Sequence, residues 1–119
     1  MLLLLMQGPY TLDNMSIDAN VTNTLPGIFA LGMIEDYKFI VKHIGRSDTD
    51  INAQLKTWVG KNYTSFKFSY ATSSKAAFAK ECKNFHDFGG TQQLDNDIHP
   101  ERPVNTDWGC HFCGVYDYI

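Results

Sequence analysis

The spacing of apolar and polar side chains along the chain predicts three β-strands. Residues 27–31 are small and apolar, and after a turn at about residues 32–36 the alternation over residues 37–43 places Phe39, Val41 and His43 on one face of a second strand. These two runs predict a β-hairpin. A third run, residues 66–70, alternates aromatic side chains with lysine and serine and predicts another strand.

Two further segments carry apolar side chains at helical spacing. The first, residues 49–59, follows capping aspartates and ends before Gly60. The second, residues 74–87, follows Ser73 and ends before a pair of glycines. The predicted order is therefore strand, strand, helix, strand, helix, which is an α+β arrangement.

The length of the chain suits one domain. Its 119 residues, of which 44% are hydrophobic, can form one compact core and are too few for two ordinary domains. We expect an irregular, turn-rich N-terminal extension over residues 1–25 with at most one short strand, the domain itself over residues 26–90, and an extended tail over residues 91–119.

Nothing in the sequence predicts contact with a membrane. The longest apolar run, residues 1–6, is far shorter than a bilayer span and lacks the flanks of a secretory signal. Three cysteines leave one without a partner after any pairing, which suits a reducing compartment better than a disulfide scaffold. We therefore expect a cytoplasmic protein.

The net charge of −3 conceals a strong segregation of charge. Residues 1–37 have a net charge of −4, residues 38–83 of +6, and residues 84–119 of −5. A basic middle segment can contact a polyanion such as DNA, although a solvated lysine-rich surface explains it equally well. The lysines that we select as candidates for nucleic-acid contact are Lys42, Lys56, Lys67 and Lys80.

Two polar residues fall on the apolar faces of the predicted helices. Since each helical residue advances by about 100°, Glu81 lies only about 60° from Phe78, and Gln54 lies about 60° from Ile51. A carboxylate in this position must be paired, hydrogen-bonded or bound to a cation. Glu81 is thus either a residue at the edge of the core that bridges to a lysine, or a metal-binding or catalytic carboxylate. Because glutamine is neutral and tolerates the edge of an apolar face, Gln54 is explained more simply as a structural residue.

Several motifs, taken in order, resemble the GIY-YIG nuclease domain. Gly27, Ile28 and Phe29 are followed 13 residues later by His43, Ile44 and Gly45, and then by a helix, a strand and a helix that contains a glutamate. The match is best with a little-characterised microbial subgroup through "GRSD" after the second motif, "FKF" on the third strand, "AF-KEC--FHDFGG" on the second helix and "HP-RP---DW-C--C" in the tail.

This resemblance implies a fold, an activity and a metal. The fold would be a small three-stranded antiparallel sheet flanked by helices, and the activity hydrolysis of DNA phosphodiester bonds with one divalent ion, Mg²⁺ or Mn²⁺. Glu81 matches the family's metal-binding carboxylate. A hard cation needs only one or two protein carboxylates, because water and substrate phosphate complete its shell.

Three positions differ from the family pattern. Phe29 and His43 stand where the family has tyrosines, and Gln54 stands where it has a catalytic arginine. One interpretation is that His43 accepts the proton of the attacking water and Arg46 supplies the missing positive charge. A second is that the domain binds nucleic acid without cutting it, and a third is that Gln54 was introduced to silence a toxic nuclease. A protein-interaction module is a further alternative.

The last residues contain a C-x₂-C pair formed by Cys110 and Cys113. A structural zinc ion normally has four ligands, and only one such pair is present, so the ligand candidates would be these two cysteines with His86 and His99. We favour the simpler interpretation, in which zinc is absent and the two thiols belong to a tail that folds back on the domain. The oligomeric state cannot be predicted from the sequence.

Overall fold

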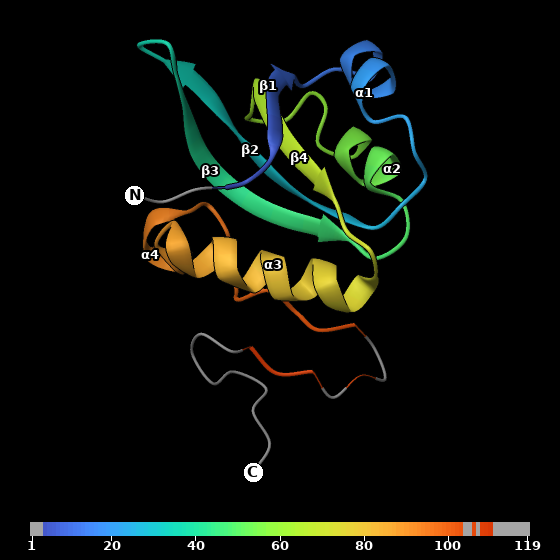
Figure 1. Ribbon diagram of the computed structural model, residues 1–119. Helices are drawn as coiled ribbons and strands as arrows, with labels where there is room; N and C mark the ends of the chain where they lie inside the picture. Colours follow the sequence, from blue (N-terminus) through green and yellow to red (C-terminus); the bar gives the residue numbers. More distant parts are fainter. Residues whose placement is uncertain (1–3, 104–105, 107, 111–119) are drawn as a thin grey trace.

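The computed structural model describes residues 4–103, 106 and 108–110, and these form a four-stranded antiparallel sheet with helices on both faces (Figure 1). The strands are β1 (Gln7–Thr11), β2 (Gly27–Glu35), β3 (Lys38–Ser47) and β4 (Ser65–Tyr70), in the spatial order β1-β4-β2-β3. The helices are α1 (Asn14–Asn20), α2 (Ile51–Lys56), α3 (Ser74–Asp87) and α4 (Gly90–Gln93). The predicted α+β class is confirmed.

The predicted number of strands is wrong, because β1 adds a fourth strand to the sheet. It pairs with β4 through Gln7, Tyr10 and Thr11, with a shift of register in between. The side chain of Asp13 then caps α1 by accepting a hydrogen bond from the backbone N–H of Ser16 at 2.7 Å. β1 is the one short strand that the sequence allowed in the N-terminal extension, whereas α1 was not predicted, since a seven-residue helix is too short to show a period.

Two apolar layers lie on opposite faces of the sheet. Helices α1 and α2 cover one face, and α3 and α4 cover the other (Figure 1). The first core contains Leu12, Ile17, Val21, Phe29, Leu31, Ile51, Leu55, Phe66 and Phe68, and the second contains Leu4, Ile28, Ala30, Ile44, Ala77, Phe85 and Leu94. Residues of the C-terminal segment pass along the outer side of α3, where Cys110 is buried against Phe78 and Cys82.

A β-bulge at Lys42 decides which side chains of β3 face which helix layer. His43 pairs with Leu31 and Val41 pairs with Gly32, so Lys42 has no partner on β2. Phe39 and Val41 pack in the α3 layer, but after the bulge His43 faces the α2 layer, where its ring lies 4.5 Å from that of Trp58. The predicted placement of His43 on the face of Phe39 and Val41 is therefore wrong, because a regular alternation does not reveal an inserted residue.

The ends of the elements agree with the predicted ones to different degrees. The turn of the hairpin contains only Asp36 and Tyr37, both with positive φ, so β2 and β3 are longer than expected. Helix α3 has the predicted bounds, whereas α2 ends at Lys56. Gly89, with φ of 99°, ends α3 and leads into α4, which we did not predict.

Among the helices of the described residues, none is long and apolar enough to cross a bilayer.

The exposed edge of the sheet at β3 is closed by the segment after α4. The backbone N–H of Asp95 donates to the carbonyl of Lys42 at 2.6 Å. The side-chain carbonyl of Asn96 accepts from the N–H of Ile44 at 3.0 Å, and its amide group donates to the carbonyl of Ile44 at 2.7 Å. Asn96 therefore replaces a missing neighbouring strand and fixes the following loop beside β3.

Candidate functional site

A pocket of about 240 Å³ opens at the β3 edge of the sheet. Its walls come from β2, β3, α2, α3 and the loop after α4. The five residues that the sequence predicts as catalytic all line it, namely Phe29, His43, Arg46, Gln54 and Glu81. The other lining residues are Ile44, Gly45, Trp58, Asn96, Ile98, His99, Pro100 and Glu101.

The aromatic wall of the pocket belongs to the α2 layer. The Phe29 ring is buried and lies against Gly45, where a Cβ atom would be only 2.8 Å from Cε2 of the ring. The ring of Phe29 is stacked with the ring of His43, with 6.5 Å between the two centroids. Gln54, on α2, is half-buried and contributes its polar side chain to this wall.

His43 is held in its neutral form by this environment. Burial lowers the pKa of the imidazole below its usual value, against the opposing charges of Asp95 and Asp97. Tyr63 lies 6.1 Å from the His43 ring and donates its hydroxyl hydrogen to Asp95 at 2.9 Å. Burial, with the bond to Asp95, raises the pKa of Tyr63 to about 12, so its phenol stays protonated. Of these two groups, His43 is the one able to accept a proton near neutral pH.

Arg46, Glu81 and Asp48 form a charged cluster on the opposite face of the sheet. The guanidinium of Arg46 donates to Glu81 through Nη1 at 2.6 Å and to Asp48 through Nε at 2.8 Å. It also lies 5.1 Å from the centroid of the Phe78 ring. Arg46 therefore forms ion pairs with two carboxylates, and the Arg46 side chain is only 11% exposed.

Glu81 is the more deeply buried of the two carboxylates. Burial raises the pKa of Glu81 to about 7; Arg46 opposes this rise, and the nearby Asp48 adds to it. A carboxylate that is only partly ionised near neutral pH can bind a cation or exchange a proton. The predicted alternatives for Glu81 included a bridge to a lysine, but the partner in the structure is Arg46.

The four lysines predicted to contact nucleic acid do not form one surface. Lys56 is paired with Asp18 of α1 at 2.6 Å, on the α2 side of the sheet. On the other side, Lys67 lies over the Phe39 ring at 5.5 Å, and Lys80 donates to the carbonyl of Leu4 at 2.6 Å. Lys42 occupies the bulge next to the pocket residue His43, and Lys80 precedes the pocket residue Glu81.

Three residues of the site were missed by sequence reasoning. Trp58 lines the pocket, but its place in an apolar helical stripe indicates only a core residue. Asp48 was assigned to helix capping, yet the cap of α2 is Asp50. Asn96 lies in a segment with no periodicity, where only its polar, turn-forming neighbours gave any signal.

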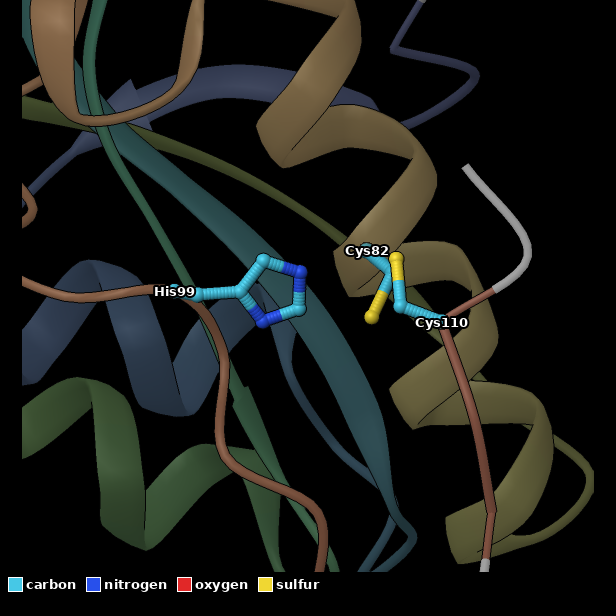
Figure 2. A group of neighbouring side chains, drawn as sticks. All are labelled: Cys82, His99 and Cys110. Carbon is cyan, nitrogen blue, oxygen red and sulfur yellow. The ribbon is translucent and has the colours of Figure 1, made fainter. Parts of the chain in front are cut away.

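A second group of side chains lies beside the pocket, on the outer side of α3. Cys82, His99 and Cys110 place a sulfur, a ring nitrogen and a sulfur within 4.8 Å of one another (Figure 2). Of the predicted zinc candidates, His99 and Cys110 thus come together, and His86 contacts His99 with 3.1 Å between their Nε2 atoms. Cys113 lies outside the described residues. Cys82 was not among the candidates, because a cysteine in a helical apolar stripe is typical of a core.

Comparison with known proteins gives no relative on which to base a function. No family model matches the chain, and neither the curated proteins nor the solved structures gave a match. Function therefore has to be inferred from the residues themselves and from the geometry of the pocket.

Proposed function

We propose that the chain is a metal-dependent endonuclease of the GIY-YIG type that hydrolyses DNA phosphodiester bonds. The observation that supports this proposal is that Phe29, His43, Arg46, Gln54 and Glu81 line one pocket, although they come from β2, β3, α2 and α3. A phosphate group needs the polar, partly buried walls that such a pocket offers.

The side chains suggest separate roles. A neutral His43 is suited to accept the proton of the attacking water, because its pKa is lowered by burial. Arg46 lies where it can stabilise negative charge on the phosphate, and Gln54 can donate hydrogen bonds to the same group without adding charge. Phe29 has no polar group and would shape the pocket only.

The residues of the pocket fit a divalent cation of the Mg²⁺ or Mn²⁺ type. Such ions prefer oxygen ligands, and Glu81 and Glu101 both line the pocket. Glu81 would hold the ion while sharing its carboxylate with Arg46. When bound, the ion would supply positive charge for the scissile phosphate and the leaving oxygen.

A second candidate is a domain of the same fold that binds nucleic acid without cutting it. Two observations favour it: Arg46 is already engaged by two carboxylates, and Gln54 brings no charge of its own. Loss of one transition-state charge contact costs about 10²–10³-fold in rate, so such a pocket could retain its shape and lose its activity.

A nicking assay on supercoiled plasmid with Mg²⁺ and with Mn²⁺ separates the two. The proteins are the wild type, Glu81→Ala, Gln54→Arg and, as a matched control, Glu35→Ala, whose carboxylate is exposed at the end of β2. We expect nicking by the wild type and by Glu35→Ala, loss of nicking in Glu81→Ala, and faster nicking by Gln54→Arg.

Other outcomes decide against the endonuclease. Nicking that persists in Glu81→Ala would mean that the activity does not come from this pocket. If neither the wild type nor Gln54→Arg nicks in either metal while DNA binding is retained, the non-cleaving binding domain is correct. Absence of DNA binding at low salt would leave a protein-interaction module.

A further inference from the structure

The three side chains on the outer side of α3 have the chemistry of a transition-metal site. Cys82 comes from the middle of α3, His99 from the loop after α4, and Cys110 from the C-terminal segment, and Figure 2 shows the imidazole ring directed toward the two sulfur atoms. Both cysteines are buried, and no disulfide joins them. Two thiols and an imidazole favour a soft or borderline ion such as Zn²⁺ over Mg²⁺.

The spacing of the three ligand atoms fits a single zinc ion. Zn–S distances of about 2.3 Å and Zn–N distances of about 2.0 Å in a tetrahedron place the ligand atoms about 3.4–3.8 Å apart. The three atoms here lie within 4.8 Å of one another, so only small adjustments of their side chains would bring them to these separations. Each thiol that binds would release its proton to the solvent.

The tautomer of His99 is that of a metal ligand. Its Nδ1 atom lies 2.8 Å from the carbonyl oxygen of Pro100, and a carbonyl can only accept, so Nδ1 carries the hydrogen. Nε2 then has the lone pair, which accepts a hydrogen bond from Nε2 of His86 at 3.1 Å, and a bound ion would replace this hydrogen bond. A backbone carbonyl that fixes the tautomer in this way is the usual second-shell partner of a zinc-bound histidine.

We propose that Cys82, His99 and Cys110 bind a structural Zn²⁺ ion. The fourth ligand would be a water molecule or His86, whose Nε2 atom lies 3.1 Å from that of His99. The ion would tie the C-terminal segment to α3 and would fix the loop that carries His99, a residue of the pocket wall.

The first test is the metal content of the full chain, purified without added metal and under reducing conditions. We expect about one zinc per chain by mass spectrometry of the metal, and tetrahedral absorption bands with thiolate charge transfer after replacement by Co²⁺. In Cys82→Ser and Cys110→Ser, zinc affinity should fall at least about 100-fold, because loss of a ligand costs no less than loss of a second-shell partner. His43→Gln, a histidine outside the group, should keep its zinc.

A second measurement does not depend on the variants folding. Removal of zinc from the wild type with a strong chelator should lower Tm, and Zn²⁺ but not Mg²⁺ should restore it. A chain that contains no zinc, or whose mass under non-reducing conditions shows a Cys82–Cys110 disulfide, would overturn the proposal. Unchanged zinc affinity in Cys82→Ser and Cys110→Ser would overturn the assignment of the ligands.

Discussion

At the scale of single residues, the ion pair formed by Arg46 and Glu81 is short, at 2.6 Å, and deeply buried. Its side chains are 11% and 8% exposed, whereas the pair of Lys56 and Asp18 is largely open to solvent. Buried pairs of this kind contribute little net stability, because desolvation offsets the attraction. What they do contribute is a fixed position for both groups, which a site for phosphate or metal requires.

Replacement of Glu81 should change how stability depends on pH. In the unfolded chain the pKa of the carboxyl is near 4.5, and in the folded protein burial raises it to about 7. The folded state therefore holds more protons between these values, and the free energy of unfolding should fall by about 1–3 kcal/mol as pH rises from 4.5 to 7. Glu81→Gln should abolish this fall.

Urea denaturation at a series of pH values, without added divalent cation, measures this effect. Glu35→Gln is the control, since the carboxylate of Glu35 is exposed. It should reproduce the wild-type profile. A profile of Glu81→Gln that parallels the wild type would show that another group titrates in this range.

Gly45 and Phe29 should be coupled energetically. Glycine weakens the interior of a strand by about 0.5–1 kcal/mol relative to alanine, and at position 45 it leaves room for the ring of Phe29. Gly45→Ala should destabilise the protein by about 1–3 kcal/mol through overpacking. In a Phe29→Leu background the cost should fall by about 1 kcal/mol or more, as measured by a double-mutant cycle. Simple additivity would mean that the ring does not limit this position.

At the scale of elements, regular periodicity was predictable and interruptions were not. The bounds of α3 follow from the capping residue Ser73 and the two glycines after the helix, and the position of Glu81 on the apolar face follows from its helical angle to Phe78. The bulge at Lys42 has no periodic signal, and it decides that His43 faces the α2 layer and Arg46 the α3 layer rather than the reverse. The pairing of Arg46 with Glu81 depends on a contact across 35 residues, which spacing alone cannot give.

The link between β3 and the loop after α4 is a second feature of this kind. Ile44 is buried, so replacement of its partner by Asn96→Ala would leave its N–H and carbonyl without hydrogen bonds. We expect a loss of about 1–3 kcal/mol in the free energy of unfolding and faster exchange of the Ile44 amide hydrogen. Gln92→Ala, at an exposed position of α4, should change neither. Unchanged exchange in Asn96→Ala would show that the loop does not close this edge.

At the scale of the whole molecule, the pocket and the group around Cys82 share α3 and the loop that carries His99. Glu81 and Cys82 are adjacent in α3, yet Glu81 lines the pocket and Cys82 packs against the C-terminal segment. The helix is thus buried on two sides, between the sheet and that segment (Figure 1). A change that detaches the C-terminal segment from α3 should therefore also disturb the wall of the pocket.

The distribution of charge over the molecule predicts which lysine matters for DNA. The net charge of −3 repels DNA at long range, so the proposed binding would depend on local contacts near the pocket. Lys42 adjoins the pocket residue His43, whereas Lys80, which adjoins Glu81, donates to the carbonyl of Leu4. Lys42→Ala should weaken binding about fivefold to tenfold at 0.1 M salt and reduce the slope of log K against log salt by about one. Lys38→Ala, at the start of β3 beside the exposed turn, is the matched control and should leave the slope unchanged. Equal losses of DNA affinity in both variants would mean that the overall positive charge of residues 38–83, rather than a contact near the pocket, attracts the DNA.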